Sequence, residues 1–210
     1  SESTQTRAQK LSDPKQDDAS KKSQYVIVLD AGHGGKDEGA VSDDGKLEEK
    51  EYNLAVVKEI ARLLEQSGVK VYCTRTTDRT VSKKARVRLA NKRQADMLVS
   101  VHCNASDARK HSVRGIEVLY SKRDNGAGFT NKQLAAKLLK KTVAATGLPA
   151  RGVIRREDLY LMHHAKVPAV IVETGYLTNP SDCLYMRQEK GIRQTAWGIY
   201  QAVMETLEKY

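Results

Sequence analysis

Two histidines and one glutamate stand at or just beyond the ends of short apolar runs in this sequence. His33 lies in a glycine-rich loop after the first run, His102 ends a later run, and Glu173 ends a third. If these runs are neighbouring parallel strands, their carboxyl ends meet at one rim, where open α/β sheets bind ligands. We therefore expect the three side chains to converge.

Two imidazoles and a carboxylate favour a zinc site. Zn²⁺ accepts nitrogen and oxygen ligands and, in catalytic sites, keeps one position open for water. A further carboxylate is then needed, and Glu49 is the best candidate because it lies just before the first expected helix. Glu48 and Glu51 compete for this role, and spacing alone does not choose among the three. Because no His-Glu-x-x-His motif is present, the hypothesis depends on tertiary geometry.

Each of these residues also has an interpretation without a metal. His33 could be a turn residue, His102 a hydrogen-bonded core histidine, and Glu173 the ion-pair partner of an arginine. Glu48 and Glu51 are typical of a solvated helix start, where acidic groups interact favourably with the helix dipole. The metal hypothesis explains the strand-end residues together, whereas these alternatives explain them one at a time.

The alternation of short apolar runs with longer helical segments predicts an α/β fold. We expect a single domain with a mostly parallel twisted sheet of about five to six strands, covered by helices on both faces. Residues 1–24 are polar and almost free of large apolar side chains, which predicts a disordered leader before a catalytic domain at residues 25–210. Strands are expected at residues 25–30, 69–74, 97–102, 115–120 and 168–172, and helices at residues 52–66, 82–93, 131–146 and 189–207.

The net charge of +10 predicts an anionic partner, and the excess belongs to the folded part, with 31 basic against 22 acidic residues in 25–210. The chain has few aromatic residues and no basic cluster interleaved with them, which argues against nucleic acid. An anionic polymer such as the cell wall or its attached acids fits the same charge. Three scattered cysteines are too few for a disulfide framework or a thiolate zinc site. No apolar run approaches the ~20 residues of a transmembrane segment.

The sequence resembles the zinc-dependent N-acetylmuramoyl-L-alanine amidases of the amidase_3 family over residues 25–208. The resemblance implies that His33, Glu49 and His102 hold zinc and that Glu173 is the catalytic residue acting on the water. It thereby favours Glu49 over its two neighbours. The resemblance rests on the segments around these four residues and on further matches at residues 53–54, 74–75, 86–91, 104, 115–118 and 175–179.

The resemblance also implies a reaction, namely hydrolysis of the amide bond between N-acetylmuramic acid and L-alanine in peptidoglycan by zinc-activated water. Peptidoglycan is then the substrate, and the action is extracytoplasmic, in cell-wall remodelling. Some short single-domain members act in spore cortex maturation, which is the narrower expectation. The alternatives are a zinc peptidase or deacetylase acting on another amide, and a non-catalytic cell-wall-binding domain that would be expected to have lost a site residue.

Three further expectations concern the surroundings of the site. Asp30 or a backbone carbonyl is expected to orient a ligand imidazole. Some family members carry a long insertion that blocks the zinc, but only residues 121–130 intervene here, so we predict an open groove. An activator protein is a partner that the family allows, although a marked rise in activity on adding one would contradict the open groove. His163 and His164 are placed in a loop, where they either touch substrate or are simply exposed.

Overall fold

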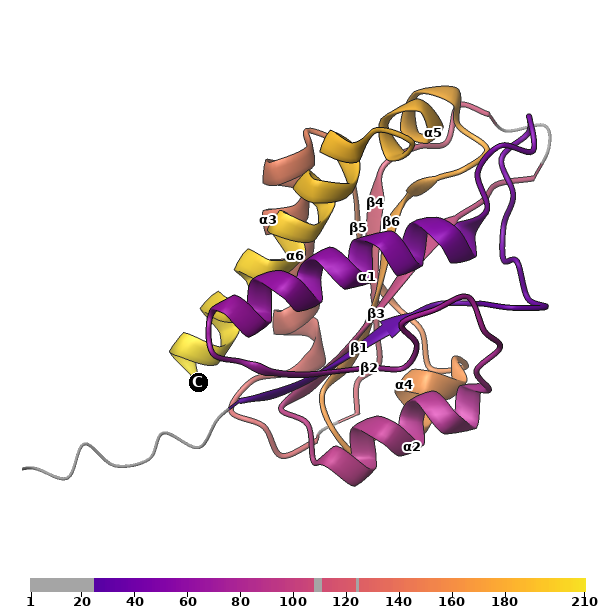
Figure 1. Cartoon of the computed structure of the whole chain (residues 1–210). Helices are drawn as coiled ribbons and strands as arrows, with labels where there is room; N and C mark the ends of the chain where they lie inside the picture. The colour runs from indigo at the N-terminus through magenta and orange to yellow at the C-terminus, as the bar shows by residue number, and fades with distance from the viewer. Residues whose placement is uncertain (1–24, 108–110, 124) are drawn as a thin grey trace, which may run out of the picture.

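The computed structural model describes residues 25–107, 111–123 and 125–210, so the predicted leader lies outside the described residues. These residues form one six-stranded sheet with helices on both faces, which confirms the predicted fold class (Figure 1). Within these ranges, no helix is long and apolar enough to cross a bilayer. The strands are β1 (Val26–Ala31), β2 (Lys70–Cys73), β3 (Met97–Asn104), β4 (Ile116–Tyr120), β5 (Ala150–Arg155) and β6 (Ala169–Tyr176). The helices are α1 (Glu49–Gln66), α2 (Lys83–Arg93), α3 (Asn131–Thr146), α4 (Tyr160–His164), α5 (Pro180–Met186) and α6 (Glu189–Lys209).

The strand order β2-β1-β3-β6-β4-β5 sets the three strands associated with the predicted site side by side. β1 pairs with β3, and β3 with β6, all in parallel, and His102 lies opposite Glu173 in this register. The carboxyl ends of these strands therefore share one rim. β4 runs antiparallel to β6, so residues 121–130 leave the sheet toward the opposite rim.

Alternation of side chains along the strands divides the sheet into two faces. On one face, Val99, Val101 and Val172 belong to a continuous core beneath α1, α3 and α6. On the other face, Leu98 and Ile171 belong to a smaller core beneath α2 and α4. His102 and Glu173 alternate with the residues of the larger core, so their side chains lie on the α2/α4 face.

Helix α1 forms because its apolar residues recur at helical spacing. Tyr52, Val56, Val57, Ile60 and Leu64 are all buried against the sheet. Complete burial of an aliphatic side chain of this size contributes about 1.5–3 kcal/mol, so this stripe anchors the helix. The start of α1, which bears the candidate Glu49, is thereby held at the rim of the sheet.

The sequence does not predict β5, α4 or α5. β5 is an edge strand with no fully buried residue, so it lacks the apolar alternation that marks a strand. α4 and α5 have five and seven residues, too few for a helical period to be recognised. β3 and β6 are also longer than expected, and His102 and Glu173 therefore lie inside their strands rather than at the ends.

Candidate metal centre and active site

His33, Glu49 and His102 come together at the shared rim from three different elements. His33 lies in the loop after β1, Glu49 is the first residue of α1, and His102 is on β3. His33 Nε2 lies 3.2 Å from Glu49 Oε1, and His102 Nδ1 lies 2.9 Å from the same oxygen. The two imidazole rings meet edge to face with centroids 4.9 Å apart.

The structure distinguishes Glu49 from the two neighbouring glutamates that spacing left open. Glu49 is 3% exposed, and its Oε2 accepts a hydrogen bond from the backbone N–H of Ala40 (2.8 Å). Its Oε1 accepts another from the backbone N–H of Cys103 (3.0 Å). Glu48 instead pairs with a lysine ammonium group, and Glu51 is exposed. Only Glu49 of the three faces the two histidines, and it is part of the helix rather than of the preceding loop.

Two glycines leave the space that these side chains occupy. A Cβ on Gly32 would lie 2.3 Å from Cε1 of His102, and a Cβ on Gly39 would lie 2.5 Å from Oε2 of Glu49. Gly39 also has φ of +72°, a backbone conformation that favours glycine. Any side chain at position 32 would displace the imidazole of His102.

Two arginines hold the His33 loop by its backbone. Arg75 Nε donates to the carbonyl oxygen of Ala31 (3.0 Å), and its Nη2 donates to that of Gly32 (2.8 Å). Arg86 Nη2 donates to the carbonyl oxygen of His33 (2.7 Å). His33 has φ of +60°, a left-handed conformation that costs an L-residue about 1–2 kcal/mol. The guanidinium hydrogen bonds stabilise this conformation and so fix the direction of the imidazole.

Asp30 contacts Arg86 rather than a ligand imidazole, which corrects the expectation from the sequence. Its Oδ1 accepts from Arg86 Nη1 and from the Thr74 hydroxyl, both at 2.6 Å, and its Oδ2 accepts from the Ser100 hydroxyl (2.6 Å). Burial opposes ionisation of Asp30, but the Arg86 charge and the two hydroxyl groups outweigh it and lower the pKa of Asp30. Asp30 therefore acts on the site indirectly, by holding Arg86.

Asp37 is the carboxylate closest to the outer nitrogen of His33. Its Oδ1 lies 2.9 Å from His33 Nδ1, although Asp37 itself is well exposed. A carboxylate at this position favours the tautomer with the proton on Nδ1, which leaves the Nε2 lone pair directed toward Glu49. Asp37 is not predicted from the sequence, and its place four residues after His33 in a tight turn is the signal that points to it.

The donor set and its electrostatics fit a zinc ion. The ligand atoms of His33, Glu49 and His102 all lie within 4.8 Å of one another, close enough to reach one ion between them. Burial opposes ionisation of Glu49, but the two histidines outweigh it and hold the pKa of Glu49 far below its usual range. Burial lowers the pKa of each imidazole, but Glu49 outweighs it and the pKa of both is raised. A divalent cation bound among Glu49 and the two imidazoles would take the place of the protons on the ligating imidazole nitrogens, so the same positions suit a metal ion.

Glu173 lies directly beside this centre on β6. It is the register partner of His102 on one side and of Glu117 on the other. Its Oε2 is buried and has no hydrogen-bond partner among the described residues. Burial, the largest influence, raises the pKa of Glu173 to about 7, and Glu49 and Glu117 act in the same direction. A carboxyl group with this pKa exchanges protons readily near neutral pH.

A cavity of about 290 Å³ opens next to the four residues on the α2/α4 face. Its polar side is formed by the candidate site itself and by Arg86 and Lys83. Its other side is apolar and comes from α4 and the sheet. The lining includes His33, His102, Glu173, Val81, Lys83, Arg86, Leu159, Tyr160, Leu161 and Ile171. The cavity thus has both polar and apolar walls and is large enough to hold a small chemical group beside the candidate site.

Residues 27–205 match the family described as N-acetylmuramoyl-L-alanine amidase, amidase_3. The chain belongs to this family. Among relatives, the amidase domain is 37% identical over 187 residues to the probable cell wall amidase LytH of Staphylococcus aureus, covering 88% of this chain and 58% of LytH. It is 36% identical over 163 residues to the N-acetylmuramoyl-L-alanine amidase LytC of Bacillus subtilis, covering 78% of this chain and 32% of LytC. The chain thus spans about a third of LytC and somewhat more than half of LytH.

Two solved structures resemble this chain over almost their whole length. The catalytic domain of the N-acetylmuramoyl-L-alanine amidase CwlV of Paenibacillus polymyxa has a TM-score of 0.81 and 32% identity, covering 89% of this chain and 100% of CwlV. The CwlD amidase of Clostridioides difficile, solved in complex with the GerS lipoprotein, also has a TM-score of 0.81, with 29% identity, and the match covers 88% of this chain and 99% of that one. The fold described above is therefore the fold of these amidases.

A polar cluster continues from Glu173 along the sheet of the amidase domain. Glu117 Oε1 accepts hydrogen bonds from Tyr176 Oη (2.8 Å) and from Arg151 Nε (2.6 Å). Asn104 Nδ2 donates to the Tyr176 hydroxyl oxygen (3.1 Å). From the sequence, Glu117 and Asn104 are only positions of resemblance to the family, with no role predicted for either. The side chains of Tyr176, Arg151 and Asn104 surround the carboxyl group of Glu117 and fix it beside Glu173.

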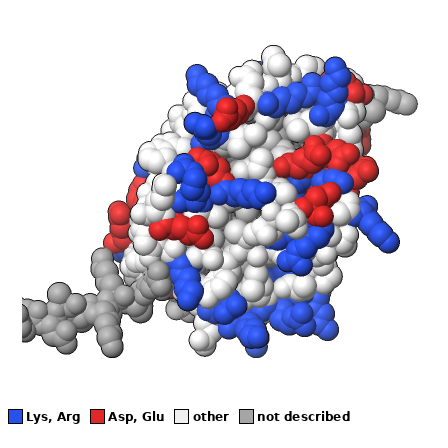
Figure 2. Space-filling model, in the orientation of Figure 1, with Lys and Arg blue, Asp and Glu red and all other residues white. Residues whose placement is uncertain are grey.

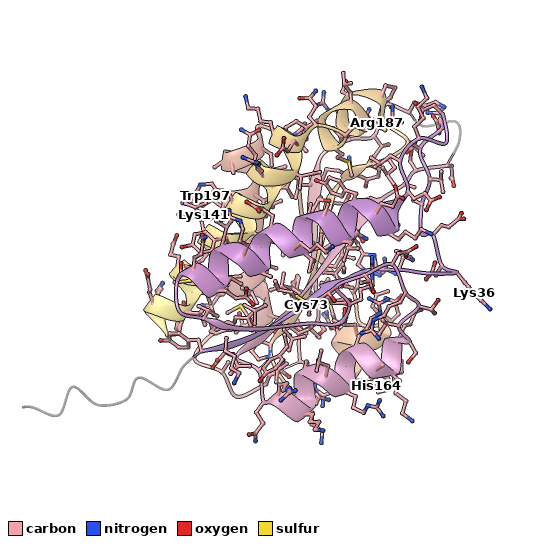
Figure 3. All side chains as sticks on the ribbon, in the orientation of Figure 1. Lys36, Cys73, Lys141, His164, Arg187 and Trp197 are labelled. Carbon is pink, nitrogen blue, oxygen red and sulfur yellow. The ribbon has the colours of Figure 1, made fainter. Side chains whose placement is uncertain are left out.

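His163 and His164 lie on α4 rather than in a loop, and both are exposed. The ring of His164 stacks on Tyr160 with centroids 3.9 Å apart, and Figure 3 shows His164 next to α2 at the edge of the molecule. The cavity beside the candidate site is lined by Tyr160 but by neither histidine, and we call it the catalytic cavity for its place in the proposed function. The structure therefore gives these histidines no contact with the candidate site.

Proposed function

We propose that this chain is a zinc-dependent amidase that hydrolyses the bond between N-acetylmuramic acid and L-alanine in peptidoglycan. The observation that carries the proposal is the convergence of a His-Glu-His donor set with the unpaired carboxyl group of Glu173 in a member of the amidase_3 family. Its site of action would be extracytoplasmic, in the cell wall or periplasm, because peptidoglycan lies there.

In this proposal His33, Glu49 and His102 hold the metal, and Glu173 moves protons. Bound zinc would supply a Lewis acid that polarises the scissile carbonyl and makes the attacking water more acidic. Glu173 accepts a proton from that water and delivers it to the leaving nitrogen of alanine. The Oε2 atom of Glu173 is buried and has no hydrogen-bond partner among the described residues, so this carboxylate oxygen is available for both transfers. The adjacent cavity, with apolar side chains from α4, would hold groups that flank the scissile bond.

The direct test is incubation of the chain with purified peptidoglycan and identification of the products by mass spectrometry. We expect release of stem peptides with a free N-terminal alanine, loss of release with a chelator, and recovery with added zinc. The Glu173→Ala variant should release at least about 100-fold less, because a general base contributes about 10²–10⁴-fold. A matched control is Glu208→Ala, which removes an exposed carboxylate on α6 and should retain full activity.

Other outcomes would redirect the assignment. Cleavage of a different amide by the zinc-loaded chain would identify a peptidase or deacetylase. Intact peptidoglycan after incubation with a zinc-loaded, folded chain would indicate an activator-dependent enzyme or a non-catalytic cell-wall-binding domain. A Glu173→Ala variant as active as the parent would remove Glu173 from the mechanism while leaving the metal centre in place.

We further propose that the isolated chain is active without an activator protein. Its cavity is open, and residues 121–130 leave the sheet at the opposite rim from the candidate metal centre. The CwlD structure contains a lipoprotein partner, so the test is whether adding such a partner raises the rate. A marked rise would contradict the proposal.

Spore cortex maturation is the narrower role, and cortex from cells lacking this chain should then retain peptides where muramic δ-lactam normally forms.

A further inference from the structure

Helix α2 and the neighbouring edge of the sheet carry a concentration of positive charge, which we call the α2 basic face. Its members are exposed lysines and arginines on α2, on the loop before it and on β2. They are Lys70, Arg79, Lys83, Lys84, Arg88, Lys92 and Arg93. Figure 2 shows Lys and Arg side chains gathered along the lower edge of the molecule, where α2 lies, with no acidic side chain among them.

These cations lack paired carboxylates, whereas half of the other described lysines and arginines form an ion pair. α2 contains no acidic residue, and no ion pair among the described residues includes any member of the face. By contrast, Arg151, Arg156 and Lys141 each pair with a nearby carboxylate. A surface of this kind is electrostatically unfavourable until an anion neutralises it.

The first turn of α2 shows the same feature locally. Lys83 and Lys84 occupy positions where the positive end of the helix dipole disfavours cations and favours acids. Ser82 caps the helix by accepting from the Ala85 N–H (3.2 Å), so the start of the helix is well defined. The two lysines therefore weaken the helix slightly rather than strengthen it, and stability does not explain their presence.

A groove of about 510 Å³ runs between α2 and β2 beneath these cations. Arg79, Arg88, Lys92 and Arg93 line it, and its floor includes apolar Leu89. The guanidinium group of Arg93 lies 4.0 Å from the ring centroid of Tyr72, which holds it in a defined place. Arg79 Nη2 donates to the carbonyl oxygen of Thr74 (2.8 Å) and is likewise fixed in part. The groove thus presents several cations with restricted positions rather than a set of freely mobile lysines.

The groove adjoins the candidate active site. Val81 lines both the groove and the catalytic cavity, and Lys83 at the start of α2 lines the cavity. A long molecule lying in the groove would therefore pass close to the site. This arrangement suits a polymer that accompanies the substrate rather than the substrate bond itself.

We propose that the α2 basic face binds a linear polymer of phosphodiester groups, of the kind carried by bacterial cell walls, and so retains the enzyme on the wall. Arginine forks match phosphate oxygens well, and a row of cations suits a regular row of anions. A membrane surface fits less well, because the large exposed apolar side chains among the described residues (Val41, Ile154, Leu184, Trp197 and Tyr210) all lie on other elements. Single-stranded nucleic acid also fits less well, since the face offers no free aromatic ring for stacking.

The test uses fluorescently labelled poly(glycerol phosphate) as the probe and follows its anisotropy in a series of salt concentrations. The triple variant Arg88→Gln, Lys92→Gln, Arg93→Gln removes three charges from the groove. We expect at least about tenfold weaker binding. The slope of log Kd against log salt should fall by about 2, since each phosphate contact on a flexible strand contributes about 0.7.

The matched control is Lys132→Gln, Lys140→Gln, Lys190→Gln, which removes three exposed lysines from α3 and α6 on the opposite face of the sheet. Figure 3 locates that face by Lys141 and Trp197, on the far side of the ribbon from α2. The control should bind the polymer like the parent chain. An equal loss in both triple variants would overturn the proposal, because binding would then depend on net charge alone.

Two further measurements test whether weaker polymer binding reflects loss of the fold and whether the face prefers another class of anionic partner. Lys84→Glu should raise the thermal unfolding midpoint, because it places an acid in the first turn of α2, and yet weaken polymer binding. Tighter binding of duplex DNA or of phosphatidylglycerol vesicles than of the polymer would also overturn the proposal. The binding assay is repeated with Glu173→Ala, which should lack amidase activity. Polymer binding is thereby tested separately from the proposed amidase function, and either proposal can fail without the other.

Discussion

On one face of the sheet, α1, α3 and α6 bury a continuous apolar core, whereas α2 and the short α4 cover the other face only in part. Among the described residues, the strands carry no candidate site residue on the first face, although Glu49 begins α1 at the rim of the sheet. The second bears His102 and Glu173 on its strands, the catalytic cavity and the α2 basic face. Both faces belong to the same six strands, so the difference arises from the side chains that alternate along them.

The comparison suggests a division of roles within one layer of strands. A polar group buried without a partner is costly, so a site with an unpaired carboxyl group needs a stable frame elsewhere. The α1/α3/α6 face supplies that frame, because its residues are almost all apolar and fully buried. The α2/α4 face can then keep its charges and its cavity.

The largest expected effect on stability comes from Asp30, which lies on the α2/α4 face but acts as part of the frame. Asp30→Asn leaves the buried Arg86 without its charge partner and should lower the free energy of unfolding by about 3–5 kcal/mol at pH 7. The pKa of Asp30 is lower in the folded chain than in the unfolded chain. The stabilisation that its charge provides is therefore complete above the unfolded pKa of ~3.9 and is lost as the pH falls through the folded pKa. The deficit should therefore be full at pH 7 and smaller at pH 3.

Urea unfolding at the two pH values measures this deficit. Asp158→Asn serves as the control, because it breaks an exposed pair with Arg156 and should change stability by less than about 1 kcal/mol. If the loss of unfolding free energy in Asp30→Asn grew as the pH fell, the pKa of Asp30 would not be lowered on folding.

A pair of leucines tests the division between the faces directly. Leu138→Ala, on the buried side of α3, should cost about 3 kcal/mol of stability and leave kcat/KM unchanged at 25 °C. Leu161→Ala, on α4, should cost less stability but reduce kcat/KM, since Leu161 lines the catalytic cavity. Chemical unfolding and muropeptide turnover are measured on both variants. The reverse pattern would mean that the faces do not divide stability and activity in this way.

Gly32→Ala should separate the geometry of the metal centre from the stability of the frame. The added methyl group would overlap the His102 ring, so the imidazole must move and zinc affinity should fall by about 100-fold. Competition with a chromogenic chelator measures the affinity. Gly128→Ala is the control, because a Cβ there meets its nearest atom at an ordinary 3.4 Å. Unchanged zinc affinity in Gly32→Ala would argue against His102 as a ligand.

Asp37→Asn should give the smallest of these effects. Removing the carboxylate from the outer nitrogen of His33 should weaken zinc binding by about tenfold, with little change in stability because Asp37 is exposed. The neighbouring exposed Glu38→Gln is the control. Equal affinities of the two variants would show that Asp37 does not orient His33.

Much of this architecture could be predicted because the signals are local. The spacing of apolar residues in α1 and α3 and the apolar runs of β1 and β3 reflect periods of a few residues, which a single segment displays. β5, α4 and α5 could not be predicted, since one is a half-exposed edge strand and the others are too short to show a period. His102 and Glu173 were recognisable as polar residues terminating apolar runs, even though both strands continue beyond them.

The sequence by itself therefore determined the alternation of strands and helices, the candidates His33, His102 and Glu173, and the positive charge of the folded part. The tertiary structure decided that Glu49, which spacing alone did not distinguish from Glu48 or Glu51, faces the histidines, that Asp30 holds Arg86, and that several cations without ion pairs lie together on and beside α2. These outcomes depend on the register between strands far apart in the chain and on the direction in which α1 leaves its loop. Such relations are set by packing across the sheet, which no short segment of sequence records.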